Sequence, residues 1–132
     1  INPQSIISAI KKNIDSKGLS LISTAMFSNL KNHGLDKSYY LFGAQKESPN
    51  VWDFNEKVAS CRYGVGEKCS ITTHDMIAFG YIDNPTTKEN GLIVLRNSWG
   101  SGSGDLGNYY MSYAYARKMI VSLYTLTKKE EK

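Results

Sequence analysis

The residues best suited to chemistry in this chain are a histidine and an asparagine, each set in or beside an apolar segment. His74 lies within residues 72–81, and Asn97 directly follows the apolar run Leu92–Leu95 and Arg96. An imidazole can accept and donate a proton near neutral pH. An amide carbonyl can hold that ring in one plane and one tautomer. The two side chains are therefore suited to general acid–base chemistry if the fold brings them into contact.

Both segments have the composition of β-strands. Val, Ile and Leu make up residues 92–95, and Ile77, Phe79 and Tyr81 alternate along the segment that contains His74. Residues of these types favour a pleated, half-buried surface. The connection between them, residues 83–91, is rich in turn-forming residues and returns the chain antiparallel. We therefore predict that His74 and Asn97 lie on adjacent antiparallel strands, with the amide within ~2.6–3.2 Å of the imidazole.

The motif Asn97-Ser98-Trp99-Gly100, following a strand that contains a histidine, resembles the C-terminal half of papain-like cysteine peptidases. Residues 107–110, Gly-Asn-Tyr-Tyr, are similar to the Gly-Tyr strand of that family. The resemblance implies that His74 acts as base and acid, that Asn97 orients the imidazole, and that Trp99 shields their hydrogen bond from water. It also implies an α+β fold, with an N-terminal helix packed on a bent antiparallel sheet that forms a half-barrel.

The sequence departs from the family pattern in three respects. Asp75 follows the histidine, where the family has a small or apolar residue, and Ser103 stands at the position of a second tryptophan. The nucleophile motif, Cys-Gly-Ser-Cys-Trp at a helix start, is absent from this chain. Cys61 and Cys69 precede His74 closely, on its own half of the fold, whereas the family's cleft takes its cysteine from the opposing half. We therefore expect the thiolate to come from a Cys-bearing N-terminal half, or from a companion chain of the same precursor.

Cys61 and Cys69 enclose a short loop that contains two glycines. Such a loop can bend back on itself, so a disulfide is one interpretation, and two reduced thiols are the other. A disulfide would stabilise the fold by roughly 2–3 kcal/mol in the chain-entropy model, and it would imply an oxidising compartment. No metal or other cofactor is expected, because two cysteines and His74 lack the paired spacing of a zinc site.

The remaining elements are predicted from periodicity and from breakers. Asn2 and Pro3 mark a helix start, an apolar stripe follows at helical spacing (Ile6, Ile7, Ile10 and Ile14), and Gly18 is the predicted stop. Strands are predicted over 19–27, 38–42, 108–113 and 120–126. Residues 45–58 are predicted to form a surface loop, in which Trp52 and Phe54 either cover an edge of the core or line a ligand groove. We expect one domain over residues 1–126 and a charged tail over 127–132.

Composition narrows the class of protein. The chain has 132 residues, of which 41% are hydrophobic and 21% charged, enough for one globular core. The net charge is +4, but the lysines are scattered rather than gathered into a basic patch interleaved with aromatics, which argues against nucleic-acid binding. No apolar run approaches the ~20 residues of a membrane helix. The N-terminus has no initiator Met and no signal pattern, so we expect a processed chain or a fragment.

The sequence thus predicts the His/Asn-bearing portion of a papain-like cysteine peptidase. It would hydrolyse peptide bonds in a peptide or protein substrate once a thiolate is provided from elsewhere, and it would not be active alone. The first alternative is a non-catalytic papain-like module that binds peptides or partner proteins, and the second is a structural domain without a functional site. Family members are often secreted or vacuolar, so the resemblance favours a secreted or lysosome-like location.

Overall fold

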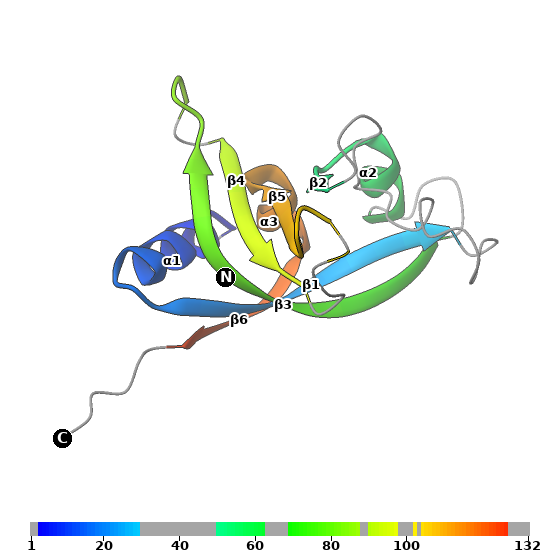
Figure 1. The fold of residues 1–132 in the computed structure, drawn as a ribbon. Helices are drawn as coiled ribbons and strands as arrows, with labels where there is room; N and C mark the ends of the chain where they lie inside the picture. The colour runs from blue at the N-terminus through cyan, green and yellow to red at the C-terminus, as the bar shows by residue number, and fades with distance from the viewer. Residues whose placement is uncertain are drawn as a thin grey trace.

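The computed structural model describes residues 3–29, 50–62, 69–87, 90–97, 102 and 104–126. Helices and strands are interleaved along these residues, and the fold belongs to the α+β class (Figure 1). In chain order they are α1 (Pro3–Asp15), β1 (Leu19–Asn29), β2 (Val51–Trp52), α2 (Glu56–Arg62), β3 (Cys69–Asp83), β4 (Gly91–Arg96), β5 (Asn108–Ser112), α3 (Tyr113–Met119) and β6 (Ile120–Leu126).

The described strands form one sheet in the order β2-β5-β4-β3-β1-β6. Each neighbouring pair in the row β5-β4-β3-β1-β6 is antiparallel, as predicted, but β2 pairs parallel with β5. The sheet is therefore mixed, and the prediction of a wholly antiparallel sheet was wrong at this edge. The strand β3 is long and strongly curved, so it pairs with β4 along one part of its length and with β1 along the other (Figure 1).

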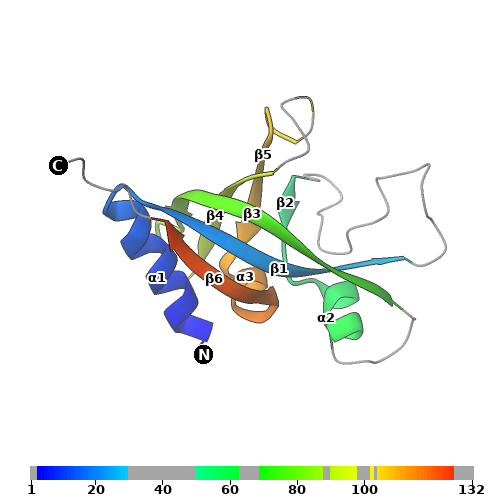
Figure 2. The ribbon, with the colours of Figure 1, turned by 90° about the horizontal axis from the view of Figure 1, so that it is seen from below.

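The helices α1 and α3 contact each other and lie against the same face of the sheet (Figure 2). Three isoleucines of the predicted stripe, Ile6, Ile7 and Ile10, are buried there against the apolar residues of the strands. This packing buries the stripe that the sequence predicted, and burial of that apolar area is the main stabilising contribution to such a helix. We call the face covered by α1 and α3 the inner face.

The end of α1 differs from the prediction. The left-handed residue is Lys17, with φ of 64°, and not Gly18. The N–H of Gly18 donates to Asn13 O at 2.9 Å and that of Lys17 donates to Ile14 O at 2.9 Å, the pattern of a Schellman ending. Gly18 is needed for space, because a Cβ at this position would collide with the side chain of Asn13.

Two helices were missed. Part of the predicted loop 45–58 forms β2 and the first turn of α2, which Asn55 caps by accepting the N–H of Val58 at 3.0 Å. The predicted strand 108–113 ends one residue early, because Ser112 caps α3 by accepting the N–H of Tyr115 at 3.1 Å. Trp52 is 1% exposed and belongs to the core, so it does not line a surface groove. The predicted strand 38–42, Asn2 and the tail 127–132 lie outside the described residues.

A disulfide joins Cys61, near the end of α2, to Cys69, the first residue of β3. The two Cα atoms are 5.8 Å apart, a normal separation for this bond. The disulfide alternative from the sequence is therefore the one that the structure contains.

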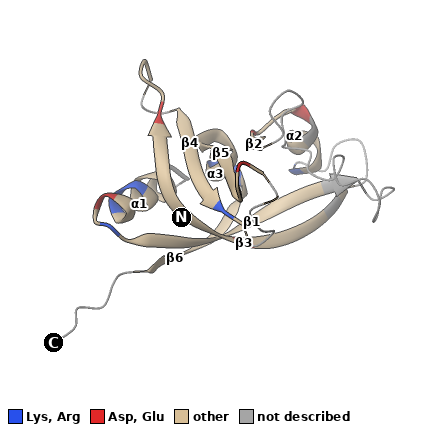
Figure 3. Cartoon of the chain, in the orientation of Figure 1, with Lys and Arg blue, Asp and Glu red and all other residues tan. Residues whose placement is uncertain are grey.

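The described lysines and arginines lie on separate elements, namely α1 and the turn after it, α2, the end of β4 and the last turn of α3 (Figure 3). Among the described residues, no helix combines the length and the apolar character that crossing a membrane requires.

Candidate functional site

The register of the sheet brings His74 and Asn97 to one place. Pairing between β3 and β4 ends at Ile77 and Arg96, and Asn97 is the next residue of the chain after β4. Side chains alternate along a strand, so Asn97 shares the inner face with Leu95, which is fully buried. His74 pairs with the fully buried Thr24 of β1, so it also lies on the inner face.

The two side chains are in hydrogen-bond contact. His74 Nε2 lies 2.7 Å from Asn97 Oδ1, within the range predicted from the sequence. An amide oxygen can only accept, so in this contact Nε2 carries the proton and the neutral ring leaves Nδ1 as its acceptor atom. Asn97 is 5% exposed, whereas His74 is half-buried. The imidazole is therefore held by a buried side chain, while His74 itself remains partly accessible.

Asp75 is directed away from the imidazole, as the alternation of strand residues predicts. It is exposed, it pairs with Ser23 of β1, and its carboxylate accepts a hydrogen bond from the Ser23 hydroxyl. Trp99 and Ser103 lie outside the described residues, so the shielding role of Trp99 stays a prediction.

Polar contacts join α3 to β1, the strand whose Thr24 pairs with His74. Thr24 Oγ1 donates to Met119 O at 3.2 Å, and the Tyr115 hydroxyl donates to Ala25 O at 2.9 Å. Burial raises the pKa of the Tyr115 phenol well above its usual value. Tyr115 therefore stays neutral and acts as a donor that ties α3 to the strand beside His74.

A turn that the sequence analysis left without a role holds the backbone of Asn97. The N–H of Asn97 donates to Gly107 O at 3.3 Å. Gly107 is buried and has φ of 91°, a conformation that favours glycine. The glycine-rich composition of residues 101–107 was the available signal for such a turn, but composition alone did not show which residue the turn would contact.

The chain contains two cysteines, and both are in the Cys61–Cys69 disulfide. Neither can therefore provide a thiolate to His74 while the disulfide is intact. Within the described part of the chain, no three His, Cys, Asp or Glu side chains gather closely enough to hold a metal ion.

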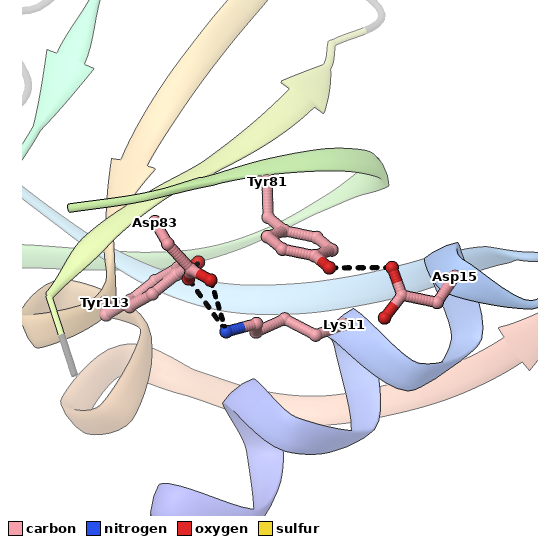
Figure 4. Close-up of polar contacts among 5 residues, drawn as sticks. All are labelled: Lys11, Asp15, Tyr81, Asp83 and Tyr113. Atoms are coloured by element: carbon pink, nitrogen blue, oxygen red, sulfur yellow. Dashed lines mark hydrogen bonds and ion pairs between the residues drawn. The ribbon is translucent and has the colours of Figure 1, made fainter. Parts of the chain in front are cut away.

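A second polar cluster lies at the other end of β3, where it fastens α1 to the sheet (Figure 4). Lys11 Nζ contacts the two carboxylate oxygens of Asp83 at 2.7 and 2.9 Å, and the Tyr113 hydroxyl donates to the same carboxylate at 2.7 Å. The Tyr81 hydroxyl donates to Asp15 at 2.7 Å. Burial, followed by the hydrogen bond to Asp83, raises the pKa of Tyr113. Lys11 Nζ also lies 5.0 Å from the ring centroid of Tyr81. These groups satisfy one another, which indicates a structural role.

No model of a protein family matches the chain, and no curated protein matches it. The functional interpretation therefore depends on the site itself.

Proposed function

We propose that this chain is the His/Asn-bearing portion of a papain-like cysteine peptidase, which hydrolyses peptide bonds through a thiolate from another segment or chain. The observation that carries the proposal is the contact of His74 Nε2 with Asn97 Oδ1 at 2.7 Å. It joins the two residues that the sequence motifs selected, and it joins them by the atoms that the chemistry needs.

The chemistry needs an imidazole with a defined tautomer. A thiolate, rather than a thiol, attacks a peptide carbonyl, and a neighbouring imidazolium stabilises it. With Nε2–H donating to Asn97, the Nδ1 atom of His74 is the one that takes the thiol proton. After attack, the same Nδ1–H donates its proton to the leaving amine nitrogen, and the C–N bond breaks to give an acyl-enzyme. In the second step Nδ1 takes a proton from water as the water oxygen attacks the thioester carbonyl. The C–S bond then breaks, the carboxylic acid leaves, and the proton on Nδ1 returns to the sulfur.

The two cysteines and the exposure of His74 indicate that the chain cannot hydrolyse peptides by itself. Both of its cysteines are held in one disulfide, so the acyl acceptor has to come from elsewhere. His74 is half-buried rather than enclosed, so part of the residue is accessible to a docked partner.

The experiment compares peptide hydrolysis by the isolated chain with hydrolysis by the protein purified natively, together with whatever co-purifies. We expect no turnover from the isolated chain and turnover from the native material. His74→Ala should reduce the native rate by at least ~100-fold, because general acid–base catalysis contributes that much or more. Asn97→Ala should reduce it less, since the imidazole remains.

The matched control is Asp75→Asn, which changes the adjacent residue on the opposite face and keeps an acceptor for Ser23. It should leave the native rate unchanged. Turnover that survives His74→Ala would refute the proposal. Native material that shows no turnover but still binds peptides would favour the alternative, a non-catalytic binding module.

A further inference from the structure

Asn97 faces the turn at residues 104–107, because it lies one position beyond Arg96 and Asn108, the last pair of β4 with β5 on this side. Asn97 is the first residue after β4, where the pairing of β4 with β3 has ended. Its backbone N–H donates to Gly107 O at 3.3 Å. Any shift of the turn therefore moves the residue whose side chain holds His74.

The turn has an unusual backbone. Gly104, Leu106 and Gly107 have φ values of 63°, 52° and 91°. For leucine this region is unfavourable, and Leu106 is 76% exposed, so its side chain gains little from packing. Arg96 of β4 donates to Leu106 O at the long distance of 3.5 Å, and the shorter contacts that hold this conformation come from other residues of the turn.

Those contacts converge on Asp105. Its backbone N–H and C=O exchange hydrogen bonds with Asn108, both at 2.9 Å. Its carboxylate accepts the hydroxyl of Tyr110 at 2.5 Å, and this hydrogen bond is the main cause of the raised pKa of Tyr110. Tyr110 is anchored in turn, because it pairs with Val94 of β4 and its N–H donates to Asn50 O at 2.8 Å.

We propose that Tyr110 is a positioning residue for the His74–Asn97 pair. Its hydroxyl fixes Asp105 and hence the turn, the turn fixes Gly107, and Gly107 fixes the backbone of Asn97. The inference depends on the proposed function only for what the pair does. The coupling from Tyr110 to His74 is a property of the fold, and it can be measured without a nucleophile.

The chain offers a matched control. Tyr81 also donates its hydroxyl to a carboxylate, that of Asp15 at 2.7 Å, and its pKa is raised chiefly by that hydrogen bond. It lies on β3, as His74 does, but in the cluster that fastens α1 (Figure 4). Tyr110→Phe and Tyr81→Phe each remove one tyrosine–aspartate hydrogen bond, and the proposal predicts that only the first affects His74.

The test is NMR on the full chain, with nitrogen-15 in the histidine rings, which reports the tautomer of His74 and the exchange of its ring N–H with water. Tyr110→Phe should accelerate that exchange by up to roughly 10-fold, the limit reached if the free energy of the lost hydrogen bond is transmitted in full to the His74–Asn97 contact. Tyr81→Phe should leave it unchanged, although both variants lower the melting temperature. Asp105→Ala should act as Tyr110→Phe does, and the double variant should accelerate the exchange no more than either single variant.

Equal exchange rates in wild type and Tyr110→Phe would overturn the proposal, and so would equal acceleration by Tyr81→Phe. If Tyr110→Phe accelerates the exchange at His74 but the natively purified protein does not hydrolyse peptides, that result would count against the proposed function alone.

Discussion

Removal of the Cys61–Cys69 disulfide should lower the stability of the fold by an amount that follows from the chain length it closes. The two cysteines are separated by eight positions. In the chain-entropy model, closing such a loop stabilises the folded protein by about 2.5 kcal/mol. For a domain of this size, that loss corresponds to a fall in melting temperature of roughly 8–15 °C.

The perturbation is the double substitution Cys61→Ala and Cys69→Ala, assayed by urea unfolding and by thermal unfolding. The slope of the urea transition tests whether the unfolded states remain comparable. A thiol reductant provides the control, because it should destabilise the wild type by a similar amount and leave the double variant unchanged. Two alkylatable thiols in the non-reduced native protein would refute the disulfide itself. A difference in unfolding free energy below ~0.5 kcal/mol would refute the entropic argument.

Two further predictions concern the inner face and the end of α1. Because burial and the hydrogen bond to Asp83 raise the pKa of Tyr113, the folded protein keeps a phenol proton that the unfolded chain releases above about pH 10. This contribution to stability should therefore be fully present below that pH and be lost as the pH rises further. Tyr113→Phe should reduce the fall but not abolish it, because the raised pKa of Tyr115 acts in the same direction, as measured by urea midpoints across this range. Gly18→Ala should destabilise by about 1–3 kcal/mol, because its Cβ would collide with the side chain of Asn13. The control Gly102→Ala, whose Cβ would have no neighbour within 4 Å, should change the unfolding free energy by less than ~0.5 kcal/mol.

The parts of the fold that could be predicted from the sequence are those with a long periodic signal. The isoleucine stripe predicted α1, and the apolar segments on either side of residues 83–91 predicted β3 and β4 as antiparallel neighbours. The contact between His74 and Asn97 could be predicted because a short connection between adjacent strands limits the possible registers. Family resemblance selected the same two residues.

The parts that could not be predicted have short or long-range signals. The helices α2 and α3 have seven residues each, too few for a helical period to stand out, and only their caps, Asn55 and Ser112, indicated where they begin. Large apolar side chains alternate at Tyr109, Met111 and Tyr113, so the predicted strand included Tyr113, which is the first residue of α3. The parallel pairing of Val51 with Tyr110 joins a two-residue strand to a distant one, and no local pattern specifies it.

The role of the turn at residues 104–107 also depends on long-range strand pairing, which no local sequence pattern specifies. Its glycines are typical of a turn, although no turn was predicted there, and the hydrogen bond from Asn97 to Gly107 follows from the register of β4 and β5. The sequence could therefore indicate which residues carry out the chemistry more readily than which residues position them.

The measurement that tests the central claim most directly is labelling of the natively purified protein with a thiol-directed epoxide, followed by mass spectrometry. If the His74–Asn97 pair serves a thiolate, the label should be found on a cysteine outside the Cys61–Cys69 disulfide, in a segment or chain that co-purifies with this one. His74→Ala should abolish the labelling, and Asp75→Asn should not. A native preparation that contains no labelled cysteine, or whose labelling is unaffected by His74→Ala, would contradict the account.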